Sequence, residues 1–362
     1  MSKTTSIFSL FLLSILALTQ LSVHSAPEHA PSLEITNETL VWKVMMKLGK
    51  VNVNVLDKKK ESSKIKGEQL VTQGSTTSFK GNRTAMTSNK LTCIACHTIQ
   101  KEHPNANNIT PQDRLEYGDS MNIPFLPGAP FYGLVNRVAF FTNDYQEIFA
   151  HKNRSALQVG HRDIRKAIQA CNTLYAKGRT LAPWEIESIL AYLWTLELKI
   201  GDLNIPAAVV HTVESAINTN KNNARAVNLM RRYYKEVYAA SLVLPLPIEE
   251  RNLISPVLND FGSGKKIYKL SCLHCHGDKR YANFKLDESQ KTFKLLKKHF
   301  DAPTRYSIYD AIRYSPGSKG NKTNPPHYTA ERMSNQQLQD LRFYIAQKAK
   351  LGSQADSYYE NF

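Results

Sequence analysis

One short pattern occurs twice in this 362-residue chain and constrains its fold more than any other feature. Cysteine, any two residues, cysteine and histidine occupy positions 93–97 and again positions 272–276. The chain contains five cysteines, so Cys171 alone lies outside the two repeats. The two repeats and the fifth cysteine are therefore the first features that any fold of this chain has to accommodate.

The pattern C-x-x-C-H is the attachment signature of c-type haem. Two thiols add across the vinyl groups on one edge of the macrocycle, and two intervening residues let a turn-to-helix segment present both sulfurs to that edge. The histidine that follows ligates the iron through its imidazole. We therefore expect two covalently bound c-type haems, held by Cys93, Cys96 and His97 and by Cys272, Cys275 and His276.

Three other uses of paired cysteines are a thioredoxin-type redox pair, half of a zinc site and a disulfide. A redox pair does not need the histidine, and no β-α-β pattern surrounds either repeat. Cysteine and histidine pairs are also zinc ligands. A five-residue match that occurs twice in one chain favours haem over these alternatives.

The N-terminus predicts export. Lys3 is the only charged residue before an apolar run at positions 7–21, which is short for a membrane span. Val23 and Ser25 suit a signal peptidase site that would release a chain beginning at Ala26. An uncleaved anchor is the alternative. Either way we expect the remainder to lie outside the cytoplasm, in the periplasm of a bacterium.

The formal net charge is +16 and is spread along the chain. A basic exported protein attracts acidic redox partners, anionic small molecules or anionic lipid. We expect an electron-accepting cytochrome or another redox protein as partner, and no nucleic acid.

Predicted helices flank both repeats, so the fold class expected is all-α, with two tandem cytochrome c-like haem domains and a partly helical linker. Helical patterns at 67–74 and 262–271 lead into the repeats, and patterns at 183–194 and 334–345 close the domains. Ser334 and Gln337 form a capping-box pattern. The expected segments are a signal peptide 1–25, an extension 26–66, domains 67–203 and 251–352, a linker 204–250 and a tail 353–362.

Cys171 lies between the first repeat and its closing helix, the region from which a distal iron ligand must come. It could be a small buried hydrophobe, an exposed thiol for dimerisation, or a thiolate on the first iron. We favour the thiolate, with Met121 and His151 as the other candidate ligands. The cations expected to stabilise it are Arg162, Arg165 and Lys166.

The first half resembles the catalytic domain of dihaem thiosulfate dehydrogenase and of the related dihaem cytochrome of the Sox system. The resemblance rests on residues 91–97, 168–171 and 191–193, with Gly178, Leu181 and Glu185. It implies that Cys171 is the distal ligand of an active-site haem. The family usually has an arginine where this chain has Ala167, which makes Arg165, Lys166 and Arg162 the candidates for binding an anionic substrate.

The second half resembles the mono-haem cytochrome c module through the run 326–333. The family's ligand methionine would fall at Pro325, so it is missing here. Met333 is the favoured substitute for that iron ligand, and His327, Lys322 or an open site are the alternatives.

Two functions from different classes follow from these features. One is a thiosulfate dehydrogenase-like oxidoreductase that oxidises a small sulfur anion at the first haem and passes electrons through the second. The other is a dihaem electron-transfer protein that serves another enzyme. A peroxidase-type dihaem protein is a third option, for which the sequence offers no convincing acid–base set.

Overall fold

A computed structural model describes residues 33–89, 91–106, 109–140, 162–234, 236–237, 240–241, 243, 258–278, 281–301, 307–313 and 328–359. The expected signal peptide lies outside these residues. No helix within the described ranges is long and apolar enough to cross a membrane.

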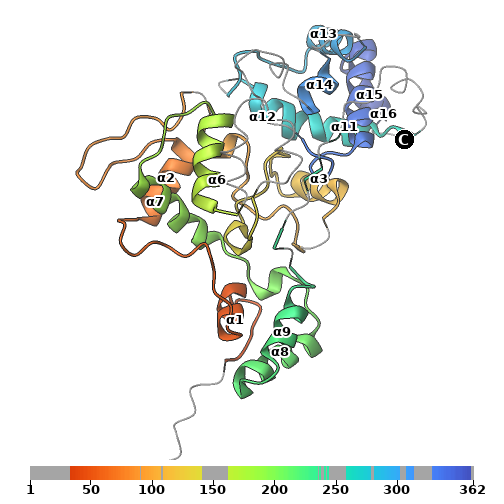
Figure 1. Cartoon of the computed structure of the whole chain (residues 1–362). Coiled ribbons are helices and arrows are strands. Elements are labelled where there is room, and N and C mark those ends of the chain that lie inside the picture. Colours follow the sequence, from red (N-terminus) through yellow and green to blue (C-terminus); the bar gives the residue numbers. More distant parts are fainter. Residues whose placement is uncertain are drawn as a thin grey trace, which may run out of the picture. The chain divides into compact units, whose positions relative to one another are not determined.

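The described part of the chain is all-α, as expected, and its only β features are isolated bridges. Figure 1 shows the helices in chain order. The α-helices are α1 (Val41–Lys47), α2 (Lys64–Gln73), α3 (Pro111–Ser120), α6 (Ile164–Ala170), α7 (Pro183–Leu193), α8 (Ala207–Thr219), α9 (Asn223–Met230), α11 (Phe261–Ile267), α12 (Leu273–His276), α13 (Gln290–Asp301), α14 (Ile308–Arg313), α15 (Asn335–Leu351) and α16 (Gln354–Tyr359). The short 3-10 and π turns are η1 (Cys93–Ala95), η2 (Leu134–Asn136), η3 (Cys171–Tyr175), η4 (Trp194–Leu196), η5 (Ile200–Asp202) and η7 (Tyr268–Cys272).

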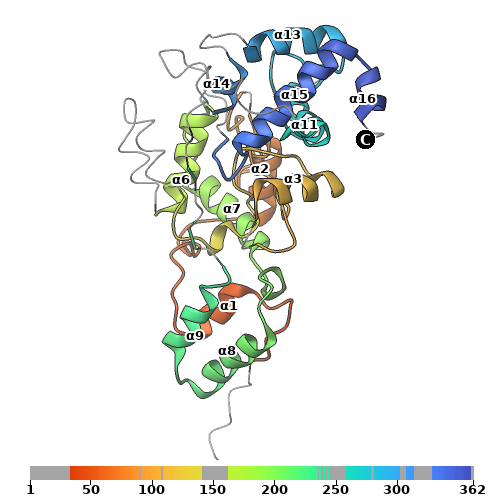
Figure 2. The same ribbon diagram turned by 90° about the vertical axis from the view of Figure 1, so that its right-hand side faces the viewer.

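Helices α2 and α7 cross in the first half, and Figures 1 and 2 both show them side by side. The crossing is close because Gly67 has no side chain, and a Cβ there would overlap the Ser188 carbonyl oxygen. Gly74 ends α2 in the left-handed conformation. The expected helices at 67–74 and 183–194 are thus confirmed, and Leu70, Leu190 and other apolar side chains form a core around their crossing.

The second half repeats this crossing with α11 and α15. Gly264 meets the backbone of Asp340, where a Cβ would overlap the carbonyl oxygen. Ser334 caps α15 and forms the predicted capping box with Gln337. The predicted helical face of α15 is buried and packs with Phe261, Ile267 and Tyr268 in one apolar cluster.

The N-terminal extension packs on the end of the first half. Val44 and Leu48 are buried, and the Trp42 amide donates to the carboxylate of Glu197 at 2.9 Å. The linker expected at 204–250 is partly helical, as predicted: it contains α8 and α9, and turns follow the end of α9 at Met230.

The two halves share packing across the predicted domain boundary. Leu115 of α3 and Phe125, both before the linker in sequence, belong to the apolar cluster of the second half. The Tyr328 hydroxyl donates to the Phe125 carbonyl at 2.7 Å. The segment from α3 to Phe125 therefore connects the two helix crossings.

Candidate functional site

The first C-x-x-C-H repeat lies on the wall of a cavity. Residues 93–95 form the 3-10 turn η1, and the His97 amide donates to the Cys93 carbonyl at 3.1 Å. This turn places Cys93, Cys96 and His97 on the wall of a cavity of about 320 Å³. Cys171 lines the same cavity.

A hydrogen bond at Nδ1 and an aromatic contact hold the His97 ring in place. Its Nδ1 lies 2.7 Å from the Ala129 carbonyl oxygen, so Nδ1 carries the proton and Nε2 has a free lone pair. The ring stacks on Phe131 with 4.7 Å between centroids. Gly128 allows the close approach, since a Cβ there would lie 2.5 Å from Nδ1. Burial lowers the pKa of His97, which favours the neutral imidazole that a metal requires.

Cys171 faces the free nitrogen of His97. Its Sγ lies 3.9 Å from His97 Nε2, although the two residues are 74 positions apart in sequence. Cys171 begins the π-helical turn η3 at the end of α6. Such turns occur often at functional sites. Burial raises the pKa of the Cys171 thiol to about 11, so the free thiol is neutral near pH 7.

The three cations expected beside Cys171 lie elsewhere. Arg165 binds the buried carboxylate of Glu187, with Nε 2.5 Å from Oε1, and does not line the cavity. Lys166 is exposed and lies 3.7 Å from Asp163. Arg162 is exposed. Helix α6 turns its apolar side to the cavity, which it lines with Ile164, Ala167 and Ile168.

Three arginines from other segments line the cavity instead. Arg114 comes from α3, Arg137 follows η2, and Arg332 precedes α15, and all three are buried. Glu102 bonds to Arg332 through two contacts of 2.5 and 2.7 Å, and its Oε1 lies 3.5 Å from Arg114. Burial opposes ionisation of Glu102, yet Arg332 and Arg114 outweigh it and lower its pKa.

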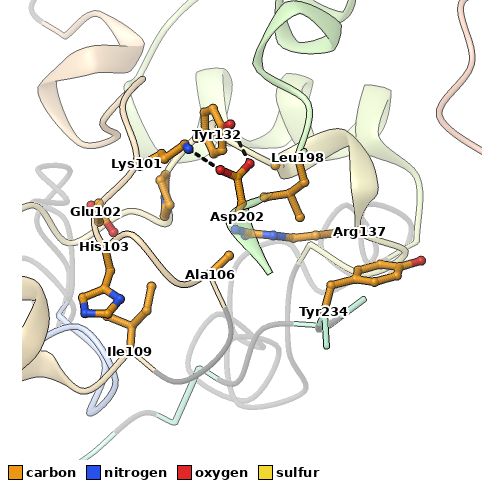
Figure 3. Close-up of a pocket in the computed structure, with 12 residues that line it drawn as sticks. Lys101, Glu102, His103, Ala106, Ile109, Tyr132, Arg137, Leu198, Asp202 and Tyr234 are labelled. Carbon is orange, nitrogen blue, oxygen red and sulfur yellow. Dashed lines mark hydrogen bonds and ion pairs between the residues drawn. The ribbon is translucent and has the colours of Figure 1, made fainter. Parts of the chain in front are cut away.

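A much smaller pocket of about 30 Å³ adjoins this wall and shares Glu102 and Arg137 with the cavity. Figure 3 shows its Lys101–Asp202 ion pair and the Arg137 side chain reaching into it. The Tyr132 hydroxyl donates to Asp202 at 2.7 Å. The space suits one or two water molecules, so this pocket is a polar structural cluster.

The second repeat differs from the first in backbone conformation but holds its histidine in the same way. The π-helical turn η7 leads through Cys272 into α12, which carries Cys275 and His276. His276 Nδ1 lies 2.8 Å from the Phe284 carbonyl oxygen. Met333 is 1% exposed and belongs to the apolar cluster against which Cys272 packs.

Of the alternative ligands, Met121 is the one that lies among the described residues. Met121 is 55% exposed and does not line the cavity. His151, Lys322 and His327 lie outside the described residues. Among the residues that are described, no three His, Cys, Asp or Glu side chains form a group suited to a bare metal ion.

The two repeats touch each other. Cys275 Sγ lies 3.9 Å from the carbonyl oxygen of Ala95, which stands between Cys93 and Cys96. The two C-x-x-C-H segments are therefore in contact.

Comparison with known protein families, curated proteins and solved structures found no match.

The sequence did not indicate the arginine cluster. Arg114 and Arg137 stand in no recognisable motif, and their proximity depends on how α3 and η2 pack. Arg332 lies within the run 326–333 that resembles a cytochrome module. That run was the one available signal for a functional arginine in this region.

Proposed function

We propose that this chain is an exported dihaem c-type cytochrome in which His97 and Cys171 are the two axial ligands of the first haem iron. The observation that carries the proposal is the 3.9 Å separation of Cys171 Sγ and His97 Nε2. Metal–imidazole and metal–thiolate bonds of about 2.0 and 2.3 Å place two opposed ligands about 4.3 Å apart. The separation in this chain is close to that value.

The residues around the cavity fit a covalently held haem. Cys93 and Cys96 supply the thiols, and Gly128 leaves the space in which the His97 ring sits. Histidines that ligate metals usually donate their second ring nitrogen to a carbonyl or carboxylate. His97 and His276 both have this arrangement, with Ala129 and Phe284 as the acceptors.

Ligation also accounts for the chemistry of Cys171. Its surroundings are apolar and burial raises its pKa to about 11, so the protein alone does not stabilise a thiolate there. A bound metal cation deprotonates a coordinating thiol. A haem thiolate would have a lower potential than a Met/His haem, which directs electrons from the first site to the second.

For the activity, we propose oxidation of a small sulfur anion such as thiosulfate at the first site. Joining two thiosulfate ions to tetrathionate forms one S–S bond and releases two electrons, one for each haem. A soluble redox protein in the periplasm would then accept them. Cys171 contributes a sulfur nucleophile, and the cavity arginines favour anions.

The second candidate is a dihaem electron carrier with no substrate of its own. It is favoured by the position of Arg165 and Lys166, which face away from Cys171 and leave it in an apolar setting. In both candidates Met333 is the proposed distal ligand of the second iron.

Low-temperature EPR and a pyridine haemochrome assay test the proposal together. Wild-type protein should contain two haems and show one thiolate-ligated low-spin signal. Cys171→Ala should retain both haems, lose that signal and convert one haem to a high-spin or differently ligated form. It should also reduce thiosulfate turnover by on the order of 10³-fold or more.

Two results would count against parts of this scheme. An unchanged EPR spectrum in Cys171→Ala would mean that Cys171 is only a packed core residue. Loss of the thiolate signal in a protein whose wild type is inactive with thiosulfate and tetrathionate would favour the electron carrier.

A further inference from the structure

Two buried arginines share a single carboxylate at the wall of the main cavity. Arg114, Glu102 and Arg332 are each at least 92% buried, at 3%, 4% and 8% exposure. Both guanidinium groups contact Glu102, and both donate to the Leu126 carbonyl. Two guanidinium groups therefore share one carboxylate in a region shielded from water.

Arg114 has an unused donor in that environment. Its Nη1 donates to the Leu126 carbonyl at 3.2 Å and its Nη2 to the Arg332 carbonyl, but its Nε has no hydrogen-bond partner. Buried polar groups are normally paired, because an unmade hydrogen bond of a charged group is costly. An acceptor with negative charge in the cavity would pair with this donor.

No other described acid on the cavity wall meets this need. Glu331 is half-buried, and both its oxygens accept bonds from the Ser241 amide, at 3.1 and 2.8 Å. Arg137 adds a third buried guanidinium to the same wall. The wall therefore suits a ligand with carboxylate groups, since arginine binds carboxylates through paired hydrogen bonds.

We infer that the Arg114–Glu102–Arg332 triad binds a carboxylate of the first haem, so that the second half of the chain completes the site of the first. This inference rests on the proposed function. Arg332 lies next to Met333, after the linker, whereas Glu102 and Arg114 lie before it. Arg332 is thus a positioning residue through which docking of the second half changes the electrostatics of the first haem.

Three variants of the haem-loaded protein test this inference by resonance Raman spectroscopy and by redox titration followed with EPR. Arg114→Gln should shift the haem propionate bending mode. It should also lower the reduction equilibrium constant of the thiolate haem about tenfold, or about 59 mV, because a buried cation near the iron is lost. The double variant Glu102→Gln/Arg332→Gln keeps the net charge, so it should leave the reduction equilibrium constant of the thiolate haem within about threefold of wild type. It should still shift the propionate mode, because a hydrogen-bonding partner is lost.

Arg179→Gln is the matched control. Arg179 also forms a two-contact ion pair in the first half, with Glu185 at 2.7 and 2.5 Å, but it does not line the cavity. It should leave the mode and the potential unchanged. The double variant removes both charges of the buried ion pair, so it leaves neither partner as an uncompensated buried charge.

A propionate mode and potential that stay at wild-type values in Arg114→Gln and in the double variant would overturn the inference. A second result would also overturn the inference. If the propionate mode does not respond to these variants but the spectrum of the protein changes when sulfate is added, the triad binds a free oxyanion instead. Neither result touches the proposed function, whose failure would show in wild-type protein as fewer than two haems or no thiolate signal.

Discussion

The two C-x-x-C-H regions are alike on the Nδ1 side of the histidine and differ in the residue proposed to oppose its Nε2. His97 and His276 both place Nδ1 within 2.8 Å of a backbone carbonyl, and each region contains a helix crossing at a glycine. On the Nε2 side of His97 lies Cys171, in a cavity lined by arginines. The counterpart proposed for His276 is a methionine in an apolar core. Under the proposed function, the shared part would hold the haem and the distinct part would set its reactivity.

Removing the thiols of one region at a time gives the largest expected effect. Cys93→Ala/Cys96→Ala and Cys272→Ala/Cys275→Ala should each lose one of two haems in a pyridine haemochrome assay. The first variant should also lose the thiolate EPR signal, and the second should retain it. A wild-type haem content near one would contradict the equivalence of the two regions.

The helix crossings provide a test of how far the regions share one architecture. Gly67→Ala and Gly264→Ala should each destabilise the protein by about 3 kcal/mol, because the added methyl group overlaps a carbonyl oxygen of the facing helix. Denaturant unfolding followed by circular dichroism measures the change. Gly81→Ala is a control in which the added Cβ meets nothing within 4 Å, although its positive φ of 85° adds local strain.

Substitution of Met333 tests the proposed difference between the distal ligands of the two haems. Met333→Leu preserves the core volume, so stability should change by less than about 1.5 kcal/mol. Loss of a thioether ligand should abolish the weak near-infrared charge-transfer band of a Met/His haem. It should also lower the reduction equilibrium constant of the second haem at least about tenfold, which is about 59 mV. An unaltered spectrum would redirect the assignment to His327.

The smallest expected effect concerns one buried carboxyl group in each half. Burial raises the pKa of Glu197 to about 7, opposed by one amide bond from Trp42, and it also raises the pKa of Asp340. Asp340 accepts two hydrogen bonds that favour its charged form, so Glu197 should contribute more.

For Glu197 the folded protein holds its proton more tightly than the unfolded chain between about pH 4.5 and 7. Stability should therefore fall as pH rises through that interval, by about 1 kcal/mol after solvent screening, and Glu197→Gln should remove this slope. Thermal unfolding at several pH values would measure it. The same slope in the Gln variant would rule out Glu197 as its source.

Local patterns were sufficient to predict the helices that build each half. The capping box at Ser334, the buried face of α15 and the helix at 183–193 were all confirmed, because short-range spacing and caps determine them. Cys171 was favoured as a ligand from its place between the first repeat and its closing helix, and the resemblance implied the same role. The structure brings its Sγ within 3.9 Å of His97 Nε2. The cations around Cys171 were not predictable from proximity in sequence, because a helix directs neighbouring residues to different faces. Arg165 thus binds Glu187, while Arg114, Arg137 and Arg332 reach the cavity through tertiary packing.

Under the proposed function, the contact between Cys275 and Ala95 implies an order of events for the newly exported chain. Once the halves have docked, the two attachment segments lie against each other. Enzymes that join cofactor to thiol would therefore have full access only to the undocked chain. Under the proposed function, both attachments precede docking, and final closure of the two halves is a late step in the maturation of the protein.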